Sequence, residues 1–370
     1  MEKKHITKGI FGLCSAVIPG VLFLFVPSLL SGHQIWSEYY SRNIFPLISW
    51  PFEFLSSQFP VSLTEIFVVF AAASFVFWVA WLIYRFIQSV HKCVFLYRLI
   101  FIAAIIFSVI SISFTLLLGI NYTRIPLNMT LSLDSPQRSP EELAEATVWL
   151  SQMMQETRDG LQEDSNGCML LSTSLSQSLS DGSRAMDAAA LSFPVLSGTT
   201  VLAKPVALSH YWSYTGITGM YFPFFGEANI NVDMPDSQIP LIICHEISHT
   251  RGIAREQDAN LAGFLACIYS DRKDFQYCAY QYVFLYCAWD LSIADETAYS
   301  KIAAMIPDSI RRDWEQNAAY WAQFEGPVQE TSTQINDSYL QANLQEEGVK
   351  NYNRVTDLIV DYYFTYVKGN

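Results

Sequence analysis

Three long apolar runs dominate the first third of the chain. They cover about residues 10–30, 66–84 and 99–119. A run of about twenty apolar residues is long enough to cross a bilayer as a helix. We therefore predict a transmembrane domain with three spans over residues 1–120, and a second domain over residues 121–370. The first run contains Pro19 and Pro27 and has no clear small-x-small cleavage site, so we expect it to remain in the protein.

Basic residues near these runs predict how the chain is oriented. Lys3, Lys4 and Lys8 precede the first run, and Arg85, Lys92 and Arg98 lie between the second and the third. The loop between the first two runs carries only Arg42. Because Lys and Arg are enriched in cytoplasmic loops, the N-terminus should be cytoplasmic. We expect everything after Gly119 to lie outside the cytoplasm, in the cell membrane of a multi-pass protein.

The pattern beyond the third run is mainly helical. Ser139-Pro140-Glu141-Glu142 combines a capping serine, a proline at the first position and a glutamate three residues past the cap, which predicts a helix start. Residues 159–184 are rich in Ser and Gly and suggest a surface excursion. Residues 275–293 contain Gln276, Gln281 and Asp290, so we interpret them as a buried helix and not as a fourth span.

A short strand is predicted before the most informative helix. In residues 227–233, Ala228, Ile230 and Val232 alternate with Glu227, Asn229, Asn231 and Asp233. This period of two is typical of a strand with one buried face. Such a strand around Asn229 and Asn231 could align an extended peptide by strand addition. The alternative is an ordinary half-buried edge strand.

Composition supports a membrane protein with an acidic outer part. The chain is 51% hydrophobic and 15% charged, which is too apolar for an ordinary soluble protein. Residues 99–370 hold 15 basic and 31 acidic residues, a net charge of −16. This charge argues against nucleic acid as a partner and against docking on anionic lipid, and its simplest role is solubility. The seven cysteines show no zinc-ribbon spacing, and we expect Cys244 to pack within its helix.

The segment His245-Glu246-Ile247-Ser248-His249 carries the candidate chemistry. Two histidines four residues apart project from one face of a helix and can bind one zinc ion. Glu246 would then lie beside the metal and could take a proton from zinc-bound water. Gly252 is the expected helix stop, and a second helix should start near residue 254. The alternative is a surface helix with two unrelated histidines.

Catalytic zinc needs a third protein ligand and one open position. No histidine follows His249, so a third ligand from downstream must be a carboxylate, and we choose Glu256. Asp258 and His210 are the alternative ligands. Asn260 lies one turn after Glu256 and could hydrogen-bond a ligand from outside the metal shell. Four residues are candidates for the hydrogen-bond donor that would stabilise a developing oxyanion. They are Tyr214, Tyr221, Tyr339 and Arg354.

Several segments resemble a bacterial membrane family catalogued as domain of unknown function 3810. They are residues 59–65 (FPVSLTE), 119–122 (GINY), 214–219 (YTGITG), 221–223 (YFP), 226–229 (GEAN), the HExxH with its RGxAREQDAN tail, and 336–340 (NDSYL) with Gly348, Val349 and Tyr352. The resemblance covers nearly the whole chain. It implies a zinc-peptidase-like protein with three N-terminal spans, and it implies no particular substrate.

A looser resemblance is to membrane zinc peptidases of the gluzincin type, in which a Glu-x-x-Ala-Asp helix follows the HExxH helix. Glu256-Gln257-Asp258-Ala259-Asn260 is similar to it, which implies that Glu256 is the third ligand. Here Asn260 stands in place of the usual Asp, and the gap after His249 is shorter than usual.

The fold we expect is a mainly α membrane protein whose outer part is an α+β zincin-like domain with a small sheet. We predict a membrane-anchored zinc metalloendopeptidase that hydrolyses peptide bonds of a peptide or protein substrate outside the cytoplasm. The alternative function is a non-catalytic binding or sensor protein that keeps the metal for structure. An intramembrane protease is disfavoured because four charged residues crowd the motif and would be costly in lipid, namely Arg251, Arg255, Glu256 and Asp258. The sequence does not fix the oligomeric state.

Overall fold

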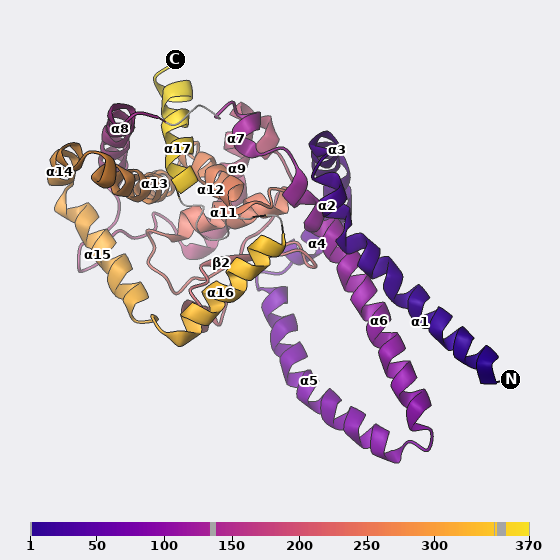
Figure 1. Ribbon diagram of the computed structural model, residues 1–370. Coiled ribbons are helices and arrows are strands. Elements are labelled where there is room, and N and C mark those ends of the chain that lie inside the picture. The colour runs from indigo at the N-terminus through magenta and orange to yellow at the C-terminus, as the bar shows by residue number, and fades with distance from the viewer. Residues whose placement is uncertain (1, 134–137, 344, 346–352, 370) are drawn as a thin grey trace.

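The computed structural model describes residues 2–133, 138–343, 345 and 353–369, and it is mostly helical with one small sheet (Figure 1). The helices are α1 (Glu2–Leu24), α2 (Val26–Leu30), α3 (Gln34–Tyr39), α4 (Phe45–Ser57), α5 (Leu63–Gln88), α6 (Lys92–Leu117), α7 (Leu127–Thr130), α8 (Pro140–Arg158), α9 (Leu175–Ser192), α10 (Ser209–Ser213), α11 (Ile239–Thr250), α12 (Glu256–Ile268), α13 (Lys273–Ala294), α14 (Glu296–Ala304), α15 (Asp308–Ala322), α16 (Pro327–Ala342) and α17 (Asn353–Tyr362). Short 3-10 or π turns are η1 (Tyr40–Ile44), η2 (Gly119–Thr123), η3 (Pro194–Leu196) and η5 (Tyr363–Val367). The strands are β1 (Lys204–Pro205), β2 (Gly219–Phe222) and β3 (Glu227–Ile230).

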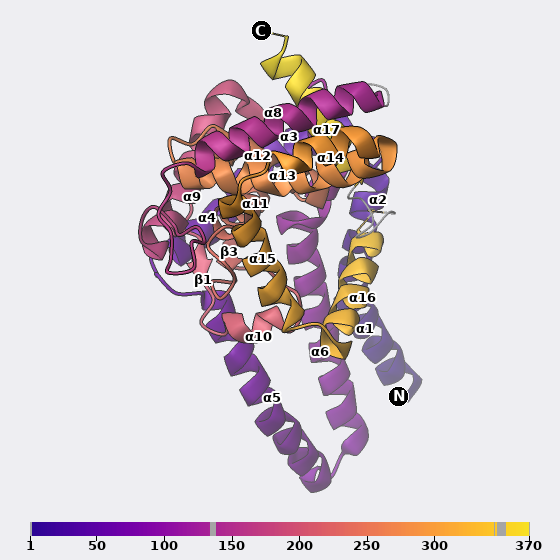
Figure 2. The ribbon, with the colours of Figure 1, turned by 90° about the vertical axis from the view of Figure 1, so that its left-hand side faces the viewer.

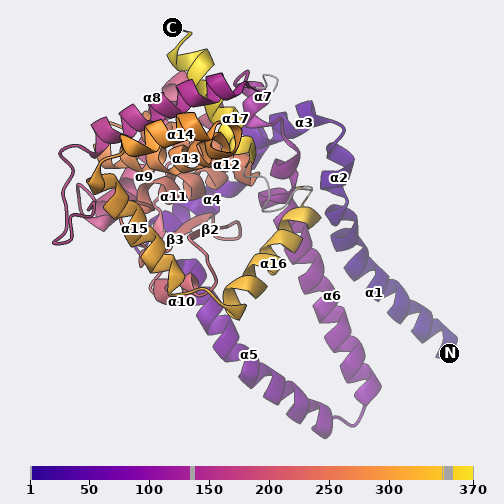
Figure 3. The same cartoon turned by 60° about the vertical axis from the view of Figure 1, so that its left-hand side comes forward.

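Three helical segments are long and apolar enough to cross a membrane, in agreement with the three predicted runs. They are Gly9–Leu30, Leu63–Gln88 and Lys92–Leu117. Helix α1 lies along α6, where the Gly20 N–H donates to Ser108 Oγ at 3.0 Å. A Cβ at Gly20 would lie 2.5 Å from the Ser108 Cα, so glycine permits this close approach. Helices α5 and α6 meet at their ends remote from the globular part and diverge toward it (Figures 1 and 3).

Two buried charged residues of the sheet form hydrogen bonds with helices α4 and α5. The Glu227 carboxylate of β3 accepts hydrogen bonds from the N–H groups of Leu63 and Thr64, at the N-terminus of α5. This position also favours a negative charge because of the helix dipole. At the end of α4, the fully buried Lys204 donates from Nζ to the carbonyl of Ser56 at 2.9 Å. The sheet that borders the site is therefore coupled to both α4 and α5.

The globular part confirms two predicted helices. Helix α8 begins with the expected capping box, in which Ser139 and Glu142 bond each other's backbone N–H groups. Helix α13 is buried in the core through residues such as Phe275 and Tyr277, as predicted for residues 275–293.

The predicted surface excursion over residues 159–184 is wrong in its second half, because α9 begins at Leu175 and is capped by Ser174. Its small residues serve close packing against α11. A Cβ at Gly182 would lie 2.2 Å from Ile243 Cγ2. Sequence rich in Ser and Gly here marks a tight helix–helix crossing inside the core and not a loop.

The sheet has the strand order β1-β3-β2, with β3 parallel to β1 and antiparallel to β2. The prediction of one buried face is wrong, because all four residues of β3 are buried. Its polar side chains bind other segments: Asn229 accepts from Ser62 Oγ at 2.6 Å, and Asn231 donates to Ser213 Oγ at 3.0 Å. Because β3 is already paired on both sides, a substrate peptide has no free edge on it, and neither asparagine aligns a substrate in the way predicted.

Candidate metal centre

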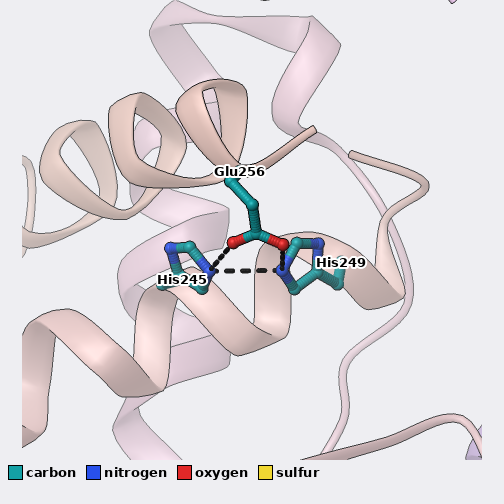
Figure 4. Close-up of side chains that lie close together, drawn as sticks. All are labelled: His245, His249 and Glu256. Carbon is teal, nitrogen blue, oxygen red and sulfur yellow. Dashed lines mark hydrogen bonds and ion pairs between the residues drawn. The ribbon is translucent and has the colours of Figure 1, made fainter. Parts of the chain in front are cut away.

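Helix α11 places the two histidines of the HExxH segment side by side. It runs through the middle of the core, and residues such as Ile243, Cys244 and Ile247 are fully buried on its inner side. Pro240 lies in its first turn, and Gln238 precedes it without a side-chain cap. His245 Nε2 and His249 Nε2 lie 3.2 Å apart, as Figure 4 shows. The four-residue spacing thus produces the expected pair of imidazoles on one face.

A tight turn brings Glu256 back onto this pair. Gly252 adopts φ +74°, a left-handed conformation that glycine reaches without strain, and ends the helix as predicted. Helix α12 then starts at Glu256. Glu256 Oε2 lies 3.2 Å from His245 Nε2, and Oε1 lies 3.9 Å from His249 Nε2 (Figure 4). One atom from each of the three residues lies within 4.8 Å of the others, which is close enough for all three to hold one metal ion.

Hydrogen bonds behind the imidazoles fix their orientation. His245 Nδ1 donates to Asn260 Oδ1 at 2.9 Å, and His249 Nδ1 donates to the carbonyl of Ile253 at 2.7 Å. With the proton on Nδ1 in each ring, both Nε2 atoms are left to face Glu256. Such partners commonly set the tautomer of metal-binding histidines. The role predicted for Asn260 is consistent with this geometry.

Charge in the cluster follows from burial and from the close contacts. Burial lowers the pKa of His249 to about 4. Burial acts in the same direction on His245, but the hydrogen bond to Glu256 and the charges of Glu246 and Glu256 raise its pKa to about 9. Burial would raise the pKa of Glu256, but His245 and His249 lower it to about 2. At neutral pH the cluster therefore holds a proton on His245, which a metal ion must displace.

Glu246 is buried between the helix and strand β2. Its side chain packs directly on Gly219, because a Cβ there would lie 2.6 Å from Glu246 Oε1. The backbone of Tyr221 also hydrogen-bonds the Glu246 carboxylate. Burial raises the pKa of Glu246 to about 8, and one of its oxygens, Oε2, has no hydrogen-bond partner. A buried carboxyl with a raised pKa and a free oxygen is suited to accept and return a proton.

The structure separates the other predicted site residues from this cluster. The Asp258 carboxylate lies 3.7 Å from Arg255 Nη1, and His210 is exposed and bonds Asp233 at 3.0 Å. Among the described residues, the metal-ligand cluster contains neither of these alternatives. Tyr214 packs against His210 and Phe324. The side chain of Arg354, like Gly348, Val349 and Tyr352, lies outside the described residues.

Three tyrosines border the cluster, and sequence reasoning singled out two of them. Tyr339 of α16, an oxyanion candidate, lies 3.2 Å from Tyr122 through their hydroxyl groups. Burial, together with the negative charge of Glu256, raises the pKa of both phenols. Tyr221, a third candidate, instead stacks its ring on His249 with centroids 6.0 Å apart. Tyr122 and Gly219 were missed as site residues, although each lies in a segment quoted for the family resemblance.

These features define a largely helical protein with three apolar helices and a His-His-Glu cluster whose two histidines are buried. A family model described as "Protein of unknown function (DUF3810)" matches residues 40–360, so the chain belongs to this family. The match includes the second and third apolar helices and the whole cluster. No curated protein and no solved structure matches the chain.

Proposed function

We propose that the protein is a zinc-dependent metallopeptidase, anchored in the membrane by its three apolar helices, with the site outside the cytoplasm. The observation that carries the proposal is the geometry of His245, His249 and Glu256 beside the buried Glu246. The positions of the helix ends support this orientation across the membrane. The N-terminal end of α1 and the α5–α6 turn both lie far from the globular part, on the side where basic residues are concentrated (Figure 1).

The three ligands fit zinc. Two imidazole nitrogens and one carboxylate are ligand types that zinc accepts, and three protein ligands leave one position open, as in catalytic sites. The hydrogen bonds from both Nδ1 atoms leave Nε2 of each ring available. Zinc bound there would polarise a carbonyl group and lower the pKa of bound water toward 7.

Glu246 would move the proton of the reaction. Its free Oε2 can accept a proton from water and return it to the leaving amine.

Strand β2 would hold the peptide, because it is an edge strand next to Glu246. The Asn231 N–H donates to the Thr218 carbonyl, which makes Thr218 a residue that bonds toward β3. Successive residues of an antiparallel strand direct their N–H and C=O groups to opposite sides, so those of Gly219 and Tyr221 face away from β3. The Tyr221 backbone bonds Glu246, so an extended substrate could pair with the remaining backbone groups of this edge.

Removing the metal should stop hydrolysis. Full-length protein in detergent is incubated with a mixed peptide library, and cut sites are read by mass spectrometry. We expect cleavage by the zinc-loaded protein, none after dialysis against a chelator, and recovery on adding one equivalent of zinc. Cleavage that persists in the metal-free protein would contradict the proposal. Zinc binding with no cleavage of any peptide would favour a structural metal.

Replacing Asn260 by alanine should weaken zinc binding about 10- to 100-fold, because His245 loses the acceptor that fixes its tautomer. The affinity is measured by competition with a chromogenic chelator. The matched control is Asn317→Ala, which removes an asparagine that bonds Ser237 instead. Equal affinities in the two variants would show that Asn260 does not support the ligand.

Replacing Gly219 by alanine should reduce hydrolysis about a hundredfold while zinc stays bound. The added methyl group would meet the Glu246 side chain at 2.6 to 2.9 Å, so the carboxylate must move. A displacement of about 1 Å at a reacting group can cost this much in rate. The control is Gly32→Ala, where a Cβ meets nothing within 4 Å. Unchanged rates in the Gly219 variant would place the acting carboxylate elsewhere.

A further inference from the structure

The metal centre is built directly on the end of a membrane helix. Helix α6 ends at Leu117, and the chain continues through η2 to Tyr122. The carbonyl of Tyr122 accepts a hydrogen bond from Arg255 Nε at 3.0 Å, and Arg255 directly precedes the ligand Glu256. Leu118 and four residues of the 3-10 turn, which rises about 2 Å per residue, separate the end of α6 from this contact, a distance on the order of 10 Å.

An apolar cluster continues from α6 to the imidazoles. Leu118, Tyr122, Tyr221 and Ala254 are buried against one another, and Phe114 of α6 packs on them. Tyr221 in turn stacks on His249. The wall of the site is thus continuous with the last turn of the third apolar helix.

The proposed peptide edge reaches the second membrane helix. Strand β2 ends at Phe222 and is followed by the turn Pro223-Phe224-Phe225. The ring of Phe225 lies 5.6 Å from that of Phe67, in the second turn of α5. One end of the edge strand is therefore fixed to α5, while the cluster described above fixes the site to α6.

The same face of the globular part exposes apolar and aromatic side chains. Tyr211 on α10 and Ile335 on α16 are each 66% exposed, and Val328 on α16 is 57% exposed. Figures 2 and 3 place α10 and α16 at the end of the globular part from which α5 and α6 leave. Aromatic and apolar side chains at the end of membrane helices are typical of the headgroup region.

We propose that the substrate is a polypeptide that is itself anchored in the membrane, cut within about ten residues of its anchor. This inference rests on the proposed function. At about 3.4 Å per residue, a chain leaving the bilayer reaches a site about 10 Å away within the first few residues. Anchoring in the same membrane also raises the effective concentration of the substrate at the edge of β2.

One measurement tests the position of the site without using activity. Full-length protein carrying Cys14→Ser and Cys93→Ser, which removes the two exposed cysteines, is labelled with a fluorophore at Tyr211→Cys or Ile335→Cys. It is reconstituted in vesicles that contain headgroup spin-labelled lipid. We expect strong quenching at both positions and none at Thr297→Cys, an exposed position on the remote helix α14. Absence of quenching at Tyr211→Cys and Ile335→Cys would overturn the proposal.

A second measurement tests the substrate class. One peptide library is offered either free or fused to a single transmembrane helix in the same vesicles, at equal bulk concentration. We expect at least tenfold faster cleavage of the anchored form, with cuts within about ten residues of the helix. Equal rates, or cuts spread beyond twenty residues, would overturn the substrate class alone. No cleavage of either form would overturn the proposed hydrolysis and the substrate class together.

Discussion

Glutamine in place of Glu246 is expected to lower the rate of peptide hydrolysis by about 10² to 10⁴ while zinc content stays the same. The side chain is 4% exposed, and glutamine has nearly its shape, so the fold should tolerate the change. The carboxylate does not belong to the His-His-Glu cluster, so its loss removes no ligand. An amide cannot accept a proton from water, which is the step assigned to this residue.

The experiment compares zinc content, by elemental analysis, with the rate of cleavage of a mixed peptide library. The control is Glu325→Gln, an exposed glutamate outside the cluster, which should leave both quantities at the wild-type level. A Glu246 variant that keeps its zinc and cleaves at the wild-type rate would remove the general base from the proposal. Loss of zinc in that variant would instead show that Glu246 binds the metal.

The His-His-Glu cluster was predictable because its geometry is local. A four-residue spacing fixes His245 and His249 on one face of a helix, and Gly252 marks the reversal that returns Glu256 to them. The apolar runs were equally readable, since twenty apolar residues exceed what most soluble helices contain. In both cases the deciding interactions lie within one or two neighbouring helices.

A strand near residues 227–233 and a small sheet were predicted and are present, but the buried surroundings of the strand were not predictable, because distant segments decide them. Glu227 and Asn229 look like the solvent face of a strand, yet they bind Thr64 and Ser62 at the start of α5. A pattern of alternating polar residues cannot distinguish water from a buried partner that lies more than 160 residues away. The same limit hid Tyr122, whose place beside Glu256 depends on how α6 meets the globular part.

Replacing His245 by alanine is expected to reduce zinc from about one ion per chain to nearly none. Two ligands remain, and two-ligand sites bind zinc far more weakly than the three-ligand sites of enzymes.

The proton held on His245 gives a second test of its role as a ligand, the pH dependence of zinc affinity. Its pKa of about 9 means that binding at pH 7 releases a proton, so wild-type affinity should rise with pH up to about 9. Calorimetry in two buffers of different ionisation enthalpy measures this release.

The matched control for this variant is His210→Ala, since His210 is an exposed histidine bonded to Asp233 and lies outside the cluster. It should keep one zinc per chain. Because an alanine at the buried His245 position could also loosen the core, the Glu256→Gln variant provides a second test. Its ligand side chain is 41% exposed, so losing the charge should disturb the fold little while lowering the affinity. Equal zinc content in wild type, His245→Ala and Glu256→Gln would refute the ligand assignment, because a site that needs neither residue is not the one described.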